Sequence, residues 1–360
     1  MESKANSPGV AAMTPPLESL VVRDSSLPYR GRYAPTPSGP LHAGNLRTAL
    51  LAWLLARRAG GVFTLRVEDL DRPRVRPGAT GAMLDDLRWL GLDWDEGPDA
   101  GGPHAPYTQS ERAALYAERL RRLQDRGLVY PCYCSRADIA RAASAPHGYA
   151  PGHPHAMDSA ASGETGEGPR YPGTCRDPAR RVIQRARAGG RPPALRFRMP
   201  EGPDGVVRFV DGLFGPVEQD VARAVGDFVV GRAGGVPAYQ LAVVVDDALM
   251  EITDVARGAD LLLSTPRQIL LYRALDLGHA VPRFLHLPLA VDTAGERLAK
   301  RHGAVGLGPW RERGYTPARV VGALAASAGL VPPDARLAPR ELLEVFDPAK
   351  LSRAPSVIDL

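Results

Sequence analysis

The sequence predicts an α/β fold built around a mainly parallel sheet. Strand-like and helix-like segments alternate near its start: an extended run at 30–34, a helical repeat at 45–58, a second extended run at 62–67 and a second helical repeat at 79–90. This alternation is typical of parallel sheets, whose ligands collect at the carboxyl ends of the strands. The Pro/Gly-rich turn at 35–40, directly after the first strand, is therefore the predicted binding site.

Apolar spacing supports the first helix. Leu46, Leu50, Trp53 and Leu54 recur at helical intervals, and Gly60 ends the repeat. Further along we expect helices at 111–126 and 266–277, strands at 195–199, 206–210, 228–230 and 241–245, and short helices in the last sixty residues.

Composition indicates a basic chain without a membrane segment. It has 360 residues, a formal net charge of +5 and a pI of about 9.2, which suits a polyanionic partner. No stretch approaches the roughly 20 apolar residues of a membrane helix, and the first residues lack a secretory signal. We therefore expect a cytoplasmic protein with no membrane partner.

The run from Arg32 to Asn45 has the character of a phosphate-binding turn between a strand and a helix. Small residues let a nucleotide approach the backbone, the helix start offers free N–H groups, and His42 can donate to phosphate oxygens. A turn of this kind with one histidine is more often structural. The interpretation as a phosphate site therefore rests on the whole run from Arg32 to Asn45.

That string resembles the HIGH signature of class I aminoacyl-tRNA synthetases, and the run from Arg32 to Leu41 is similar to the glutamyl branch of that family. The resemblance implies a Rossmann-type catalytic core. Asn45 stands where the signature has its second histidine and keeps a hydrogen-bond donor. The implied ATP ligands are His42, Gly44 and Asn45, and the implied glutamate ligands in this turn are Arg32, Tyr33, Ala34, Pro35 and Thr36.

The run from Arg297 to Arg301 resembles the KMSKS loop of the same family, with Ala299 in place of the serine. Taken by itself, a run of five such residues is more often a solvated basic turn than a functional loop. Only 3 of the 45 basic residues are lysines, however, so Lys300 favours a specific role. We expect Lys300 to bind ATP and to act with His42 in catalysis, its ammonium lying beside the phosphates where negative charge develops.

Glutamate carries two carboxylates and an ammonium, and burying any of them unpaired is costly. Arg32 and Arg257 can bind carboxylates, Glu68 can bind the ammonium, and Tyr239 can donate its hydroxyl. Taken singly, each of these residues is more often a surface ion or a core aromatic than a substrate ligand. Together they match the substrate positions that the resemblance implies, although which carboxylate each arginine binds stays open.

Three cysteines gather in one window: Cys132, Cys134 and Cys175. Two thiolates separated by one residue bridge each other poorly but can both bind a tetrahedral Zn²⁺. Chemistry alone favours a histidine as the fourth ligand, from His147, His153 or His155. The resemblance implies Tyr171 instead, because Cys-x-Cys followed by a tyrosine and, four residues later, a cysteine is similar to the pattern of glutamyl-Q tRNA(Asp) synthetases. We expect one structural zinc per chain; three buried small residues are the alternative.

Only 59 residues follow Arg301, whereas a full glutamyl-tRNA synthetase continues into a large anticodon-binding region. This feature again resembles the glutamyl-Q tRNA(Asp) synthetases. The resemblance implies a monomeric ATP-dependent ligase that activates L-glutamate with ATP and Mg²⁺ without needing tRNA. It then transfers glutamate to queuosine at the wobble position of tRNA(Asp).

Three other functions stay open: a truncated glutamyl-tRNA synthetase that charges the 3′ end of tRNA(Glu), a small-molecule nucleotidyltransferase, and a non-catalytic RNA-binding module. The arginine-rich stretches 119–126 and 176–191 either follow an RNA backbone or are solvated helix faces.

Five regions are expected along the chain. They are a disordered tail at 1–27, the first half of the catalytic domain at 28–131, a zinc-binding insertion at 132–190, the second half at 191–285, and the KMSKS-like loop with a short helical region at 286–360. Within the insertion, residues 143–168 are rich in Gly, Pro, Ser, Ala and His, which predicts a flexible segment.

Overall fold

The computed structural model describes residues 20–21, 26–143, 169–291 and 306–358. Its centre is a seven-stranded sheet in the order β1-β6-β10-β9-β2-β3, with β7 paired to β6 off this path. All neighbours pair in parallel except β6 and β7, which confirms the predicted parallel α/β core. The strands are β1 (Leu20–Val21), β2 (Arg30–Tyr33), β3 (Val62–Leu65), β6 (Val206–Asp211), β7 (Gly215–Asp220), β9 (Asp254–Gly258) and β10 (Arg283–Leu287).

The strand order reverses between β2 and β9. From β2 the chain proceeds to β3 on one side, whereas β9 and β10 lie on the other, and Gly31 of β2 pairs with Asp254 of β9. In open α/β sheets such a reversal leaves a crevice at the carboxyl ends of the two strands, where ligands bind. The turn after β2 and the end of β9 therefore face the same crevice.

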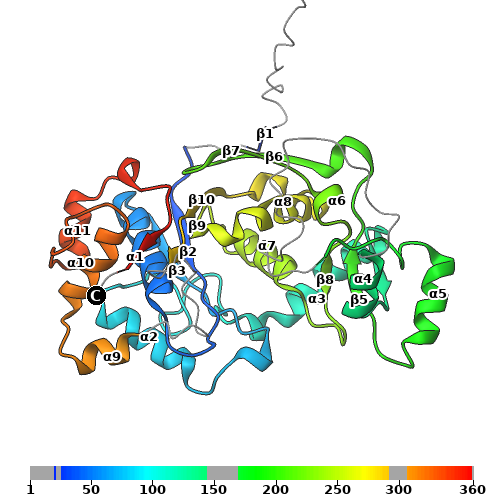
Figure 1. Ribbon diagram of the computed structural model, residues 1–360, viewed down its shortest axis with the longest axis horizontal. Helices are drawn as coiled ribbons and strands as arrows, with labels where there is room; N and C mark the ends of the chain where they lie inside the picture. Colours follow the sequence, from blue (N-terminus) through cyan, green and yellow to red (C-terminus); the bar gives the residue numbers. More distant parts are fainter. Residues whose placement is uncertain (1–19, 22–25, 144–168, 292–305, 359–360) are drawn as a thin grey trace, which may run out of the picture.

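Helices cover both faces of the sheet (Figure 1). One face carries α1 (Ala43–Arg58) and α2 (Ala79–Trp89), with α9 (Leu307–Glu312), α10 (Pro317–Ser327) and α11 (Pro339–Val345) outside them; the other carries α7 (Tyr239–Leu249) and α8 (Thr265–Ala274). Each face has its own buried apolar cluster. Trp53 and Leu46 belong to the first, and Leu241 and Tyr272 to the second.

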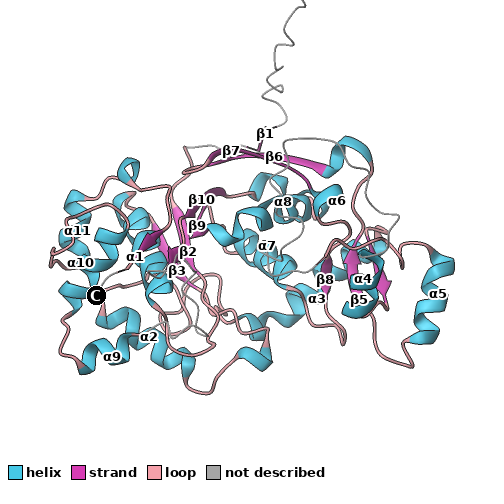
Figure 2. Ribbon diagram, in the orientation of Figure 1, coloured by secondary structure: helices cyan, strands magenta, loops and turns pink. Residues whose placement is uncertain are grey.

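A smaller antiparallel sheet lies beyond α7, in the order β4-β5-β8 (Figure 2). It consists of β4 (Val129–Cys132), β5 (Ala194–Phe197) and β8 (Val229–Gly231), accompanied by α3 (Ala113–Asp125), α4 (Arg136–Ala143), α5 (Pro178–Arg187) and the short α6 (Val221–Ala224). The remaining short elements are β11 (Ala290–Val291), β12 (Ser356–Val357) and 3₁₀ helices at Arg72–Arg74, Gln109–Arg112, Gly202–Gly205, Ala259–Ser264, Gly278–Ala280 and Pro348–Lys350. Among the described residues, no helix is both long and apolar enough to cross a membrane.

The predicted strand at 241–245 is wrong, because these residues belong to α7. Every residue from Gln240 to Asp247 is buried, so the helix lacks the polar face that gives amphipathic helices their period. Its run of valines therefore resembles a buried strand. The expected N-terminal tail also differs at Leu20–Val21, which pairs with β6.

The C-terminal region packs on α1, the helix that begins beside the predicted phosphate turn. Gly322 of α10 lies so close to the following loop that a Cβ there would meet the Ala335 carbonyl oxygen at 1.8 Å. Arg47 of α1 donates to Ser356 Oγ at 2.6 Å, which ties β12 to the same helix. The last residues thus support the turn on which the candidate site is built.

Candidate active site and metal centre

Arg32 and Arg257, the two predicted carboxylate ligands, lie on adjacent strands at the reversal point. Arg32 is in β2 and Arg257 in β9, and both are buried, with 4% of each residue exposed. Burying two guanidinium groups this deeply requires acidic or polar partners. The structure thus places the two arginines on neighbouring strands of the sheet.

A buried group of charges surrounds Arg32. Asp247 of α7 accepts from Arg32 Nε at 3.3 Å and from Arg66 Nη1 at 2.7 Å. Arg66 also donates to Glu68 Oε1 at 3.1 Å and lies 3.7 Å from Asp246. Arg66, which follows β3, therefore connects the predicted ammonium ligand Glu68 to the carboxylate that holds Arg32.

The charges in this group stabilise one another. Burial favours the neutral form of Asp247, yet Arg32 and Arg66 outweigh it and lower its pKa. Burial likewise opposes the charged form of Arg66, but Asp247, Asp246 and Glu68 together raise its pKa. For Glu68, burial dominates over Arg66 and Arg32 and raises its pKa. Glu68 is thus the carboxylate of this group that a further cation would stabilise most.

Two tyrosines belong to the same electrostatic neighbourhood. Burial raises the pKa of Tyr239 at the start of α7, and the charges that act on it are Arg257, Glu68, Arg32 and Asp247. Tyr272 of α8 is only 1% exposed, and its hydroxyl has no hydrogen-bond partner among the described residues. Buried polar atoms without partners are rare in folded proteins.

The turn after β2 is closed by backbone hydrogen bonds. Arg66 N donates to the Tyr33 carbonyl and Glu68 N to the Pro35 carbonyl, both at 3.0 Å. These bonds place the run from Arg32 to Thr36, which includes Ala34, directly beside Glu68. Tyr33 itself is buried, and its hydroxyl donates to the Asn45 carbonyl at 3.2 Å.

His42 caps the N-terminus of α1. Its Nδ1 accepts from Asn45 N at 3.3 Å, so the neutral ring carries its proton on Nε2, where it can donate to an anion. A Cβ on Gly44 would lie 3.2 Å from the His42 ring and 3.3 Å from the Ala290 side chain. Glycine therefore keeps this helix start compact, as a phosphate site at a helix N-terminus requires.

Lys300 and the run 297–301 lie outside the described residues, as do His147, His153 and His155. The described residues that flank 292–305 do approach the turn. Gly306 forms a bridge with His42, and Ala290 of β11 lies beside Gly44. Both chain ends around the KMSKS-like run are thus held at the predicted ATP site.

The three cysteines come together as predicted. Their sulfur atoms all lie within 4.8 Å of one another, and Cys134 Sγ is 3.5 Å from Cys175 Sγ. Tyr171 Oη lies 3.4 Å from Cys132 Sγ and 3.8 Å from Cys134 Sγ. A hydrogen bond from Cys134 lowers the pKa of Cys132 to about 5, although burial opposes its ionisation.

This cluster fits a tetrahedral zinc ion. Zn–S bonds of about 2.3 Å place thiolate sulfurs roughly 3.8 Å apart, close to the 3.5 Å between Cys134 Sγ and Cys175 Sγ. Arg196 contributes a positive charge: its Nε donates to Cys132 Sγ at 3.3 Å, and its guanidinium lies 3.8 Å from the Tyr171 ring centre. The three-cysteine cluster is therefore consistent with zinc binding.

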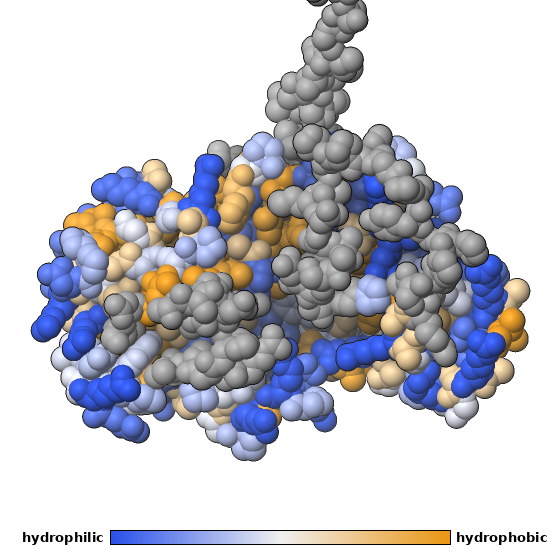
Figure 3. Space-filling model, viewed as in Figure 1, coloured by the Kyte–Doolittle hydropathy of each residue, from blue (hydrophilic) through white to orange (hydrophobic). Residues whose placement is uncertain are grey.

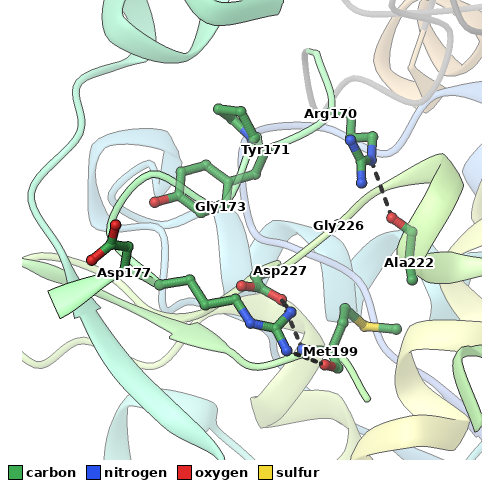
Figure 4. A pocket seen from close by; sticks show the side chains of 10 residues that line it. Arg170, Tyr171, Gly173, Asp177, Met199, Ala222, Gly226 and Asp227 are labelled. Carbon is green, nitrogen blue, oxygen red and sulfur yellow. Dashed lines mark hydrogen bonds and ion pairs between the residues drawn. The ribbon is translucent and has the colours of Figure 1, made fainter. Parts of the chain in front are cut away.

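A cavity of about 430 Å³ adjoins this cluster, and Figure 4 shows Tyr171 and Asp227 in its wall. The two arginines that line it are already bonded. Arg176 donates to Asp227 at 3.3 Å, and Arg170 donates to the Ala222 carbonyl at 3.1 Å. Arg176 is thus paired with a carboxylate, whereas the contact of Arg170 is with a backbone carbonyl.

The sequence analysis missed the residues that hold the site together. Asp247, Arg66, Asp211, His286 and Thr265 are all buried and bonded to predicted ligands or to one another. One signal was available: the acidic pair Asp246-Asp247 directly follows a run of three valines, and carboxylates next to an apolar run need buried partners.

Comparison with known proteins identifies the family. The family described as tRNA synthetases class I (E and Q), catalytic domain, matches residues 29–354. The chain belongs to this class I glutamyl and glutaminyl tRNA synthetase family. Membership confirms the predicted ligase class and the Rossmann-type catalytic core, and the family uses ATP with Mg²⁺.

Similar members of the family carry two names. A glutamyl-Q tRNA(Asp) synthetase of Symbiobacterium thermophilum is 56% identical over 325 residues, which are 90% of this chain and 94% of the relative. One of Nitratidesulfovibrio vulgaris is 47% identical, over 91% of this chain and 95% of the relative. A glutamate–tRNA ligase of Halorhodospira halophila is 44% identical, and the aligned part covers 93% of this chain but 66% of the ligase.

The solved structures agree with the fold. A glutamate tRNA ligase of Elizabethkingia meningosepticum, solved with its amino acid, superposes with a TM-score of 0.73 at 28% identity. The superposition covers 92% of this chain and 67% of that structure. The fold built on the parallel sheet is thus shared with a solved synthetase.

Proposed function

We propose that this chain activates L-glutamate with ATP to form glutamyl-adenylate without needing tRNA, and then transfers glutamate to the queuosine base at the wobble position of tRNA(Asp). The observation that carries the proposal is the 56% identity to a glutamyl-Q tRNA(Asp) synthetase across 94% of its length. Identity to the glutamate–tRNA ligase is lower, at 44%.

In this proposal, glutamate binds at the reversal between β2 and β9. Arg32 and Arg257 bind its carboxylates, Glu68 binds its ammonium, and Tyr239 donates a hydrogen bond. The Nη1 atom of Arg257 is buried without a partner among the described residues. This is expected of a group that binds a carboxylate oxygen of the substrate. The backbone of Tyr33, Ala34, Pro35 and Thr36 completes the pocket beside Glu68.

ATP binds at the start of α1 in this proposal, against His42, Gly44 and Asn45. The α-carboxylate of glutamate attacks the α-phosphorus of ATP, forming the acyl–phosphate bond while pyrophosphate leaves. His42 and Lys300 stabilise the charge that develops on the phosphate oxygens; Mg²⁺, when bound with ATP, would supply further positive charge there. A queuosine hydroxyl then attacks the mixed anhydride and releases AMP, so orientation and charge stabilisation suffice without a side-chain nucleophile.

We assign zinc a structural role, bound by Cys132, Cys134, Cys175 and Tyr171. It would cross-link the end of β4 to the segment before α5. We also propose that the chain is divided in the same way. Its catalytic domain is split by the zinc-bearing segment at 132–190, and a C-terminal region begins at 286.

The RNA would lie along the basic surface of this end of the molecule. Helix α5 has no buried residue and carries arginines at 180, 181, 185 and 187. The surface there combines strongly hydrophilic areas with apolar ones (Figure 3), including Val182, which is 68% exposed. Because tRNA and ATP are cytoplasmic substrates, we place the protein in the cytoplasm. We also propose that it acts as a monomer.

The test is glutamate-dependent ATP–pyrophosphate exchange without tRNA, followed by charging of tRNA(Asp) with and without queuosine. Exchange together with queuosine-dependent charging supports the proposal. Exchange with charging of tRNA(Glu) instead would assign the chain the activity of a glutamate–tRNA ligase, and a complete lack of exchange would refute an amino-acid-activating function.

A further inference from the structure

Arg257 is held on one side by two buried partners. Its Nε donates to His286 Nε2 at 3.0 Å, and its Nη2 donates to Thr265 Oγ1 at 2.7 Å. Both partners are fully buried. Nη2 also donates to the Leu261 carbonyl at 3.4 Å. Since Nη1 has no partner among the described residues, these contacts determine which end of the guanidinium is presented to a ligand.

His286 can accept this hydrogen bond only in one state. An arginine nitrogen is always a donor, so His286 Nε2 must carry a lone pair and the ring proton must be on Nδ1. His286 Nδ1 lies 2.6 Å from Asp211 Oδ2. A carboxylate there accepts the Nδ1 proton and thereby selects the required tautomer.

Asp211 is fixed in the accepting orientation by the backbone. Its Oδ1 accepts from Leu213 N at 3.0 Å and from Phe214 N at 2.9 Å, and its Oδ2 accepts from His286 N at 3.1 Å. A carboxylate can accept from all three donors, whereas an asparagine with its oxygen toward Leu213 N and Phe214 N would turn its NH2 group toward His286. Burial lowers the pKa of His286 to about 4, against the opposing effect of Asp211, so the ring stays neutral at physiological pH.

We propose that Asp211 and His286 are positioning residues for glutamate binding, which act through Arg257: Asp211 sets the tautomer of His286, and His286 holds the guanidinium with its Nη1 end toward the substrate carboxylate. The inference rests on the proposed function of Arg257. It adds two buried residues, Asp211 of β6 and His286 of β10.

The experiment uses Asp211→Asn in the full chain, with Asp227→Asn as the matched control. Asp227 is also a buried aspartate that accepts a backbone N–H and other donors, but it lies beside the zinc cluster. In Asp211→Asn the amide can donate to Nδ1, which turns Nε2 into a donor that faces the Arg257 Nε–H. We expect the KM for glutamate in ATP–pyrophosphate exchange to rise roughly 10- to 100-fold, the range for misplaced binding groups, while the KM for ATP stays within about twofold.

A second variant separates positioning from general loss of structure. His286→Gln retains an oxygen that can accept from Arg257, and His286→Leu does not. We expect the glutamine variant to bind glutamate more tightly than the leucine variant, although both lose the imidazole. Equal KM values for glutamate in the two variants, or an unchanged value in Asp211→Asn, would overturn the inference.

The wild-type chain provides a readout that needs no variant to fold. In a chain labelled with ¹⁵N-histidine, the ring of His286 should show a protonated Nδ1 and an unprotonated Nε2 at pH 7, with the signal assigned by its loss in His286→Gln. A protonated Nε2 would refute the inference. If wild-type protein showed no glutamate-dependent exchange, the proposed function would fail, whereas a normal wild type with an insensitive Asp211→Asn would reject the positioning role alone.

Discussion

Replacing Arg66 with methionine should destabilise the whole catalytic core. Arg66 is completely buried and contacts three carboxylates, those of Asp247, Glu68 and Asp246. Arg32 and Arg112 supply the other two positive charges of the group. Methionine has a similar length but no charge, so the variant leaves three buried carboxylates with only two cations.

The expected cost follows from the burial of these groups. Removing one partner of a buried ion pair typically costs about 3–5 kcal/mol, because the remaining charge stays desolvated. For a chain of 360 residues, an unfolding entropy of about 2.1 cal/mol/K per residue converts this cost to a fall in Tm of roughly 4–7 °C. The KM for glutamate should rise as well, because Glu68 and Arg32 are both held through this group.

Calorimetry of the wild type, Arg66→Met and Arg122→Met tests this expectation. Arg122 pairs with Glu118 on the exposed face of α3, and exposed pairs contribute only about 0–1 kcal/mol. Its variant should therefore unfold within about 1 °C of the wild type. A Tm for Arg66→Met equal to that of Arg122→Met would show that the buried charge group does not stabilise the core, and would refute the reasoning.

Three further results are expected. As the pH falls toward the raised pKa of Glu68, protonation of its carboxylate should raise the KM for glutamate. The KM of Glu68→Gln should be high at every pH and show no such rise. Parallel pH profiles for the two proteins would contradict the ammonium-binding role of Glu68. Cys175→Ser should lower bound zinc, measured by mass spectrometry, from one ion per chain, and lower the Tm while pyrophosphate exchange continues; unchanged zinc content would count against the ligand set. Gly322→Ala should lower the free energy of unfolding in urea by about 1–3 kcal/mol, because its Cβ meets the Ala335 carbonyl oxygen. At Gly308 a Cβ would have no atom within 4 Å, so Gly308→Ala should leave the free energy of unfolding unchanged.

Local sequence patterns predicted β2, β3 and β6 of the seven-stranded sheet, but not β1, β7, β9 or β10. The run at 30–34, the helix at 45–58 and the run at 62–67 are found as β2, α1 and β3, with ends shifted by at most two residues. These elements are short-range and amphipathic or β-rich, so their periodicity survives in the sequence. Helix α7 was misread because complete burial removes that periodicity.

The candidate site divides in the same way. Residues within one motif, such as His42 and Gly44 or Cys132 and Cys134, could be predicted because their spacing carries the chemistry. The contacts of Asp247 with Arg32 and of Asp211 with His286 join residues 215 and 75 positions apart. Such pairs form only when the fold brings α7 against β2 and β10 beside β6, and no local pattern records them.

The most direct test of the central claim is to locate the glutamate on the RNA. Queuosine-containing tRNA(Asp) charged with labelled glutamate by this enzyme would be digested to nucleosides and separated by liquid chromatography with mass spectrometry. We expect the label and a mass increase of one glutamyl group on the queuosine nucleoside. Label on the terminal adenosine, with queuosine unchanged, would contradict it.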